Sequence, residues 1–192
     1  MGKVVVSEFI SVDGVIEDPG GAEGFERGGW AFKFDQGEDG QQFKFDELMA
    51  AESLLLGRVT YQGFAAAWPT MEGTGEFGER MNGMPKHVAS ATLTELEWSN
   101  SRLLGSDVVA SVADLRAAPG GDVLVAGSAQ LAQALAANGL VDEYRLMMFP
   151  ILLGAGKRLF GDAGAPVELE KVDSRPVGKD GVVVLTYRPK PS

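Results

Sequence analysis

The 192-residue chain contains no cysteine and only one histidine. The absence of cysteine excludes disulfides, thiolate metal sites and cysteine nucleophiles, and it suits a reducing cytoplasm, the compartment we expect. Positive charge is also scarce, with 17 basic against 27 acidic residues and a formal net charge of −10. Because no basic cluster offsets this charge locally, we expect no nucleic-acid partner.

Long apolar runs are missing as well. No stretch approaches the ~18 consecutive apolar residues that span a bilayer, so we expect no membrane association. The first residues, MGKVVVSEFISVDG, are interrupted by Glu8 and Asp13 too soon for a secretory signal and are typical of a first strand. The length suits one sizeable core, and we expect a single domain over residues 1–192.

What the chain does contain is a repeated alternation of short apolar runs, turn signals and amphipathic segments. This pattern predicts an α/β fold with a mainly parallel central sheet. The expected strands are Lys3–Phe9, Ser53–Leu56, Lys86–Ala89, Val108–Ala110, Val123–Ala126 and Glu143–Phe149. The expected helices are Asp39–Ala51, Thr60–Ala67, Val112–Ala118 and Ala129–Asn138, the third capped at Ser111.

The last third of the chain has a different pattern. Two alternating runs, Val167–Val172 and Val182–Tyr187, flank a connector with proline and glycine, which predicts a C-terminal antiparallel hairpin. The segments Asp18–Gly29 and Met71–Gly83 are rich in glycine and acidic residues and have little periodicity. We expect long loops there, serving as functional lids or mobile connections.

The first candidate site lies in LLLGRVTYQGF, where a buried strand ends at Gly57 and a helix follows. Gly57 permits a close approach of ligand to backbone, and the helix N-terminus favours an anion. Arg58 adds a planar cation and Thr60 a hydroxyl. The alternative is that Gly57 only ends the strand, Arg58 is solvated and Thr60 caps the helix.

A second passage from strand to helix, DVLVAGSAQLAQAL, places Gly127 and Ser128 in the same context. Two phosphate-binding turns suit a dinucleotide, although the G-x-G-x-x-G spacing is absent. A third passage, KHVASATL, ends a strand in Ser90 and Thr92, whose hydroxyls suit a phosphate or ribose. Taken alone, that third passage is more often an ordinary turn.

These motifs together, with SVDG near the start, GLVDEYRL and PILLGAGKRLF, resemble the reductase domain of the bifunctional riboflavin-biosynthesis deaminase–reductase. That domain belongs to the dihydrofolate reductase-like superfamily. The resemblance runs from about Lys3 to Tyr187 and implies a three-layer α/β/α fold. It also implies an NADPH-dependent reductase of a small heterocyclic substrate, similar to 5-amino-6-(5-phosphoribosylamino)uracil reductase.

The resemblance also implies which residues hold NADPH. Gly57, Arg58 and Thr60 would line the adenosine-phosphate side, with Ser90 and Thr92 near the 2′-phosphate ribose. Ser11–Gly14 would lie beside the nicotinamide. The remaining expected cofactor contacts are Gly127, Ser128, Ala129, Gln130 and Leu131 around the diphosphate, and Leu153 and Gly154 closing the pocket.

Two carboxylates are candidates for the catalytic proton donor. Asp13 follows the first strand, but an Asp-Gly turn explains it equally well. Asp39 stands four residues before Phe43, which echoes the acid-to-aromatic spacing of the dihydrofolate reductase helix, but a solvated carboxylate at a helix start is the simpler interpretation. His87, the single histidine, is expected to be a partly exposed structural side chain.

Other features set the chain apart from the riboflavin enzyme. It has no deaminase zinc signature, and we expect no metal site because surface charge explains its acidic pairs. The acidic insertion Gly20–Gly40, with Trp30, Phe32 and Phe34, could shape a different substrate pocket.

The alternatives to an NADPH-dependent reductase are a non-catalytic nucleotide or small-molecule binding protein on the same fold, and a flavin-using reductase. We also expect a homodimer built partly on the late strands.

Overall fold

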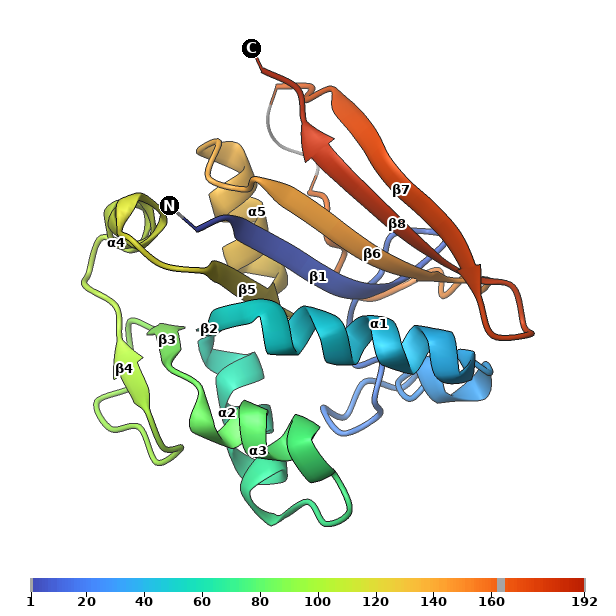
Figure 1. Ribbon diagram of the computed structural model, residues 1–192, viewed down its shortest axis with the longest axis horizontal. Coiled ribbons are helices and arrows are strands. Elements are labelled where there is room, and N and C mark those ends of the chain that lie inside the picture. The colour runs from blue at the N-terminus through green and yellow to red at the C-terminus, as the bar shows by residue number, and fades with distance from the viewer. Residues whose placement is uncertain (1, 162–164, 192) are drawn as a thin grey trace.

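The computed structural model describes residues 2–161 and 165–191. Their strands form one eight-stranded sheet in the order β4-β3-β2-β5-β1-β6-β8-β7 (Figure 1). The strands are β1 (Val4–Ser11), β2 (Ala51–Gly57), β3 (Lys86–Ala89), β4 (Ser101–Leu103), β5 (Asp122–Ala126), β6 (Glu143–Phe149), β7 (Leu169–Val177) and β8 (Val182–Pro189). The α-helices are α1 (Gly37–Ala50), α2 (Arg58–Ala67), α3 (Gly75–Gly83), α4 (Val108–Ala117) and α5 (Ala129–Ala137).

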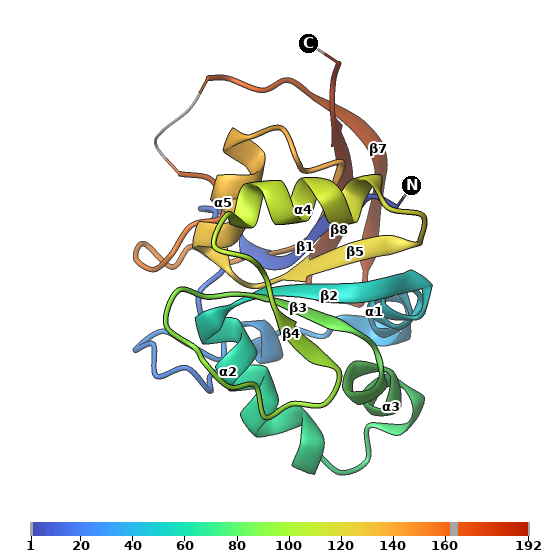
Figure 2. The same ribbon diagram turned by 90° about the vertical axis from the view of Figure 1, so that its left-hand side faces the viewer.

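Helices cover both faces of the sheet. Figure 2 shows α4 and α5 on one side and α1, α2 and α3 on the other. The run Val4–Val6 of β1 is buried because neighbouring residues of a strand point to opposite faces and both faces are covered. Val4 and Val6 pack into the core beneath α4 and α5, and Val5 packs into the core beneath α1, α2 and α3. The predicted three-layer α/β/α architecture is confirmed.

The sheet is parallel from β4 to β6 and ends in an antiparallel hairpin. Strand β8 pairs antiparallel with β6 and with β7, and the turn between β7 and β8 contains Gly178 and Gly181 at positive φ. Positive φ is a conformation that glycine adopts without steric cost. The predicted C-terminal hairpin is therefore confirmed, although its first strand begins at Leu169, two residues after the predicted start.

One predicted strand is wrong. Val108–Ala110 forms the first turn of α4, and the helix cap is Asp107, whose side chain accepts a hydrogen bond from the Ala110 N–H at 2.9 Å. The two valines suggested a strand, but one side-chain cap and the burial of Val112 in the core favour the helix. Ser111, the predicted cap, lies inside the helix and bonds back to the Asp107 carbonyl.

One α-helix and one strand were not predicted. Helix α3 lies within Met71–Gly83, where a long loop was expected, and it packs Met81 into the core beside α1. Strand β4 is only three residues long and extends the sheet beyond β3. Among the described residues, no helix is long and apolar enough to cross a membrane.

His87 is buried, with a side chain on β3 that is only 4% exposed, rather than partly exposed as predicted. Its Nδ1 accepts a hydrogen bond from Arg102 Nε at 2.8 Å. Burial and the Arg102 charge lower the pKa of His87 from 6.5 to about 4. The histidine is a structural acceptor on the sheet.

This shift predicts acid sensitivity. Between pH 6.5 and 4 the unfolded chain binds a proton at His87 that the native chain excludes, so the free energy of unfolding falls as the pH is lowered through this window. The loss is at most about 3 kcal/mol. Denaturant unfolding at several pH values should show a shallower pH dependence for His87→Gln than for the wild type. Equal slopes would contradict the assignment.

Candidate functional site

The carboxyl ends of the parallel strands lie at one edge of the sheet and bring the predicted motifs into a row. Along the order β3, β2, β5, β1, β6, the strand ends are followed by Ser90, Arg58, Gly127, Val12 and Pro150. Neighbouring strands are ~4.8 Å apart, so four steps span roughly 19 Å. Such a row suits an extended ligand.

The centre of this row is a topological switch point. Strand β2 leads through α2 to β3 on one side, whereas its neighbour β5 leads through α5 to β6 on the other. Helices α2 and α5 lie on opposite faces of the sheet (Figure 2). In open α/β sheets, the crevice at such a point is the usual ligand site.

The two predicted turns are in contact at this point. The Gly57 N–H donates to Ser128 Oγ at 2.9 Å, and Ser128 Oγ donates to the Ala126 carbonyl at 3.1 Å. Gly127 has a φ of +57°, and a Cβ atom there would lie 2.8 Å from Thr60 Oγ1. The turns that end β2 and β5 are therefore packed as one unit, and Gly127 has no room for a side chain.

This unit has the features of an anion site. Helices α2 and α5 both begin here, and neither has a side-chain cap on its first-turn N–H groups. Unpaired N–H groups and the helix dipole attract an anion. Arg58 opens α2 with an exposed guanidinium that donates to Gln62 at 3.0 Å, a surface contact that an incoming phosphate can replace.

The structure also shows how the other expected cofactor residues are placed. Thr60, Ala129 and Leu131 are each less than a tenth exposed, so they pack beneath the crevice, whereas Gln130 is exposed. Ser90 Oγ accepts hydrogen bonds from the N–H groups of Thr92 and Leu93 and so closes its own turn. The geometry of Ser90 matches the ordinary turn considered as its alternative.

The structure places Asp13 beside Leu153 and Gly154, a contact that the sequence did not predict. Its carboxylate accepts hydrogen bonds from Ser11 Oγ at 2.6 Å, from the Leu153 N–H at 3.1 Å and from the Gly154 N–H at 2.7 Å. These hydrogen bonds lower the pKa of Asp13 to about 2, and the bond from Ser11 has the largest effect. Through these hydrogen bonds, Asp13 ties the loops after β1 and β6 together. The low pKa favours the ionised carboxylate, which has no proton to donate.

Asp39 also has a structural role. Its Oδ1 accepts a hydrogen bond from the Gly178 N–H at 3.1 Å and so joins the first turn of α1 to the turn between β7 and β8. Asp39 does not line the pocket described next. A role for Asp39 as the proton donor stays a prediction, and this hydrogen bond gives it a structural role as well.

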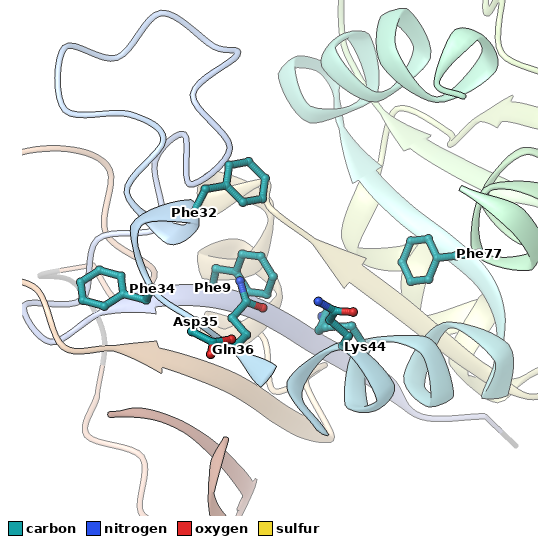
Figure 3. A pocket seen from close by; sticks show the side chains of 8 residues that line it. Phe9, Phe32, Phe34, Asp35, Gln36, Lys44 and Phe77 are labelled. Atoms are coloured by element: carbon teal, nitrogen blue, oxygen red, sulfur yellow. The ribbon is translucent and has the colours of Figure 1, made fainter. Parts of the chain in front are cut away.

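A pocket of about 420 Å³ lies on the α1 face of the sheet, and Figure 3 shows the side chains that line it. Phe32 and Phe34 come from the insertion Gly20–Gly40, so this segment lines a pocket, whereas Trp30 lies in the core. That the pocket receives the substrate stays a prediction. The full lining is Phe9, Phe32, Phe34, Asp35, Gln36, Gln41, Lys44 and Phe77. Four phenylalanines and a few polar groups suit a small planar molecule.

Lys44 lines this pocket and was not among the residues that the sequence predicted for the site. Its ammonium donates to Ser7 Oγ at 2.6 Å and to Glu47 Oε2 at 2.5 Å, and it lies 5.6 Å from the centre of the Phe9 ring. The Glu47 side chain is 1% exposed, whereas that of Lys44 is 24% exposed. The ion pair therefore presents its cation to the pocket. The signal available in the sequence was the i,i+3 spacing of Lys44 and Glu47 on α1.

No group of three or more histidine, aspartate or glutamate side chains in residues 2–161 and 165–191 could hold a metal ion. The charged residues that surround Glu47 form ion pairs instead: Arg145 lies 3.6 Å from Glu47 and 2.7 Å from Glu143. These pairs fix the position of Glu47 beneath Lys44.

Comparisons with known proteins place the whole chain among its relatives. The uncharacterized Bacillus subtilis (strain 168) protein YyaP is 27% identical over 188 residues, which cover 96% of this chain and 94% of YyaP. A crystal structure from Shewanella sp. PV-4, provisionally assigned to riboflavin biosynthesis, superposes over 100% of both chains with a TM-score of 0.77 and 24% identity.

Two more distant structures share the fold. Dihydrofolate reductase from Enterococcus faecalis, complexed with NADP(H) and RAB-propyl, has a TM-score of 0.64 and 15% identity over 99% of this chain and 98% of its own. RibD from Acinetobacter baumannii has a TM-score of 0.63 and 16% identity, and this chain covers 59% of its length. The fold is therefore of the dihydrofolate reductase type. The model of the RibD C-terminal domain matches residues 2–183, and the chain belongs to that family.

Proposed function

We propose that the protein is an NADPH-dependent reductase that transfers a hydride to a small heterocyclic substrate. The observation that supports this most directly is the packed pair of turns at the switch point, where two uncapped helices begin beside Gly57 and Gly127. The NADP(H) complex of the dihydrofolate reductase with the same fold supports the choice of cofactor.

The diphosphate of NADPH would bind the first-turn N–H groups of α2 and α5. Gly57 and Gly127 keep the backbone free of side chains there, and Arg58 would meet a phosphate of the adenosine part. The nicotinamide would lie toward β1, near Ser11–Gly14, where Asp13 fixes the loop to Leu153 and Gly154.

The heterocyclic substrate would bind in the aromatic pocket lined by Phe9, Phe32 and Lys44. Phe9 and Phe32 can stack on a planar ring, and Lys44 can donate a hydrogen bond to its oxygen or nitrogen atoms (Figure 3). The family suggests a compound similar to the phosphoribosylamino-uracil of riboflavin biosynthesis.

When bound, NADPH supplies the hydride. Hydride addition to the carbon of a C=N or C=O group leaves an electron pair on the nitrogen or oxygen, which must gain a proton. We assign that proton to the Lys44 ammonium, since Asp13 and Asp39 are engaged elsewhere. Ser7 and Glu47 hold the ammonium in place.

The test is to follow NADPH absorbance with the purified protein and a panel of aminouracils and pteridines. We expect a member of the panel to be reduced with consumption of NADPH. NADPH that binds but is never consumed by any compound would favour a non-catalytic binding protein. A yellow protein that retains flavin would favour the flavin-using alternative.

Arg58→Ala tests the adenosine end of the site. If Arg58 meets the 2′-phosphate, the variant should lose about tenfold or more in NADPH affinity and little in NADH affinity, because only NADPH has that phosphate. Calorimetric titration with both nucleotides measures the difference, and Arg175→Ala, which changes an exposed arginine on β7 at the opposite edge of the sheet, is the matched control. Equal losses for both nucleotides would move Arg58 to the diphosphate.

A further inference from the structure

Glu8 is a carboxyl group buried beneath the nucleotide crevice with an unsatisfied oxygen. The residue is 5% exposed, and its Oε1 is buried without a hydrogen-bond partner among the described residues. A buried carboxyl oxygen without a hydrogen-bond partner is costly and rarely kept for stability alone. Neither the fold nor the roles assigned so far explain it.

The register of the sheet places Glu8 next to the diphosphate turn. Ser7 pairs with Ala126, so Glu8 lies level with Gly127, and the Gly127 N–H is one of the groups that lower the pKa of the Glu8 carboxyl. On the other side, Glu8 pairs with Leu146 of β6. Its side chain is on the same face as Val6 and Ile10, which is the face that α5 covers.

The charged groups around Glu8 come from two other elements. The positive charge of Lys44 on α1 lowers the pKa of Glu8, whereas the negative charge of Glu47 on the same helix raises it. Glu23, in the loop after β1, also raises this pKa. Burial outweighs the favourable effects of Lys44 and the Gly127 N–H and raises the pKa of Glu8 well above 4.5. The native protein therefore favours the uncharged acid.

We propose that Glu8 carries a proton while nucleotide is bound, so that the affinity for the nucleotide falls when this proton is lost. This inference rests on the proposed function, because it assumes that the diphosphate lies over Gly127. A neutral carboxyl beside the turn leaves the helix N-terminus free to attract the diphosphate. An ionised carboxylate there would repel it in a poorly solvated site.

The experiment measures the Kd of NADPH by calorimetry from pH 7 to 9.5, a window above the ionisation of the 2′-phosphate (pKa about 6). Above the pKa of Glu8 in the free protein, linkage predicts that Kd rises by up to about tenfold per pH unit. Glu8→Gln, a neutral side chain of the same shape, should show a Kd that changes less than about twofold over this range. Asp46→Asn, which removes an exposed carboxylate from α1, should behave as the wild type.

A second measurement needs no variant. Repeating the wild-type titration in buffers of different ionisation enthalpy counts the protons taken up on binding, and we expect uptake in the upper part of the range. A Kd independent of pH without proton uptake would overturn the inference and leave the proposed function standing. A pH dependence that Glu8→Gln retains would also overturn it. Absence of NADPH binding at every pH would contradict both the role of Glu8 and the proposed function.

Discussion

Gly127→Ala should lower the affinity for NADPH by about a hundredfold or more, the largest effect that we expect from a single methyl group. Gly127 has a φ of +57°, and its new Cβ would lie 2.8 Å from Thr60 Oγ1 and 3.0 Å from Thr60 Cγ2. The turn must shift, and with it the N–H groups that open α5. Left-handed backbone costs an alanine a further ~1 kcal/mol. Calorimetric titration and denaturant unfolding measure the two effects.

A double variant separates the clash from a general loss of folding. Thr60→Ala removes both atoms that meet the new Cβ and leaves the nearest remaining contact at 3.5 Å. Gly127→Ala with Thr60→Ala should therefore recover part of the affinity and of the stability that Gly127→Ala loses. A Gly127→Ala protein that folds and binds NADPH as tightly as the wild type would show that this turn does not hold the nucleotide.

Lys44→Met should lower kcat by about a hundredfold or more for any substrate found in the NADPH screen, a loss typical of a missing general acid. The Kd of NADPH should stay within about twofold of the wild type, because Lys44 lies in the aromatic pocket and not at the diphosphate turn. Lys33→Met, an exposed lysine that does not line the pocket, is the control.

Folding must be checked because Lys44→Met leaves Glu47 with Arg145 as its nearest cation, at 3.6 Å. Lys44→Arg keeps the charge and the ion pair but is a poor proton donor, since guanidinium hardly releases its protons. If Lys44 donates the proton, kcat stays low in the arginine variant, whose unfolding free energy returns toward that of the wild type. Full activity in Lys44→Arg would limit Lys44 to holding the substrate.

The central sheet and its two turns could be predicted because local signals and tertiary packing agree there. Leu54–Leu56 is apolar and is buried on both faces, and Gly57 ends the strand as its context indicated. Gly127 and Ser128 follow β5 in the same way. The chain order of the motifs could not show that the two turns touch, because that contact depends on β5 lying next to β2.

Other features depend on contacts that no local pattern contains. Val108–Ala110 looks like a strand until Asp107 is seen to cap a helix. Asp13 looks like an acid at an active site, but its partners Leu153 and Gly154 lie about 140 residues further along the chain. Lys44 faces a pocket whose aromatic walls come from β1, the insertion and α3.

The most direct test of the account is calorimetric titration of the purified protein with NADPH and with NADH. We predict micromolar binding of NADPH with a clear preference over NADH, because the turns at Gly57 and Gly127 and the exposed Arg58 suit a phosphorylated dinucleotide. Binding of neither nucleotide would mean that these turns only connect strands to helices, and it would contradict the assignment of a reductase.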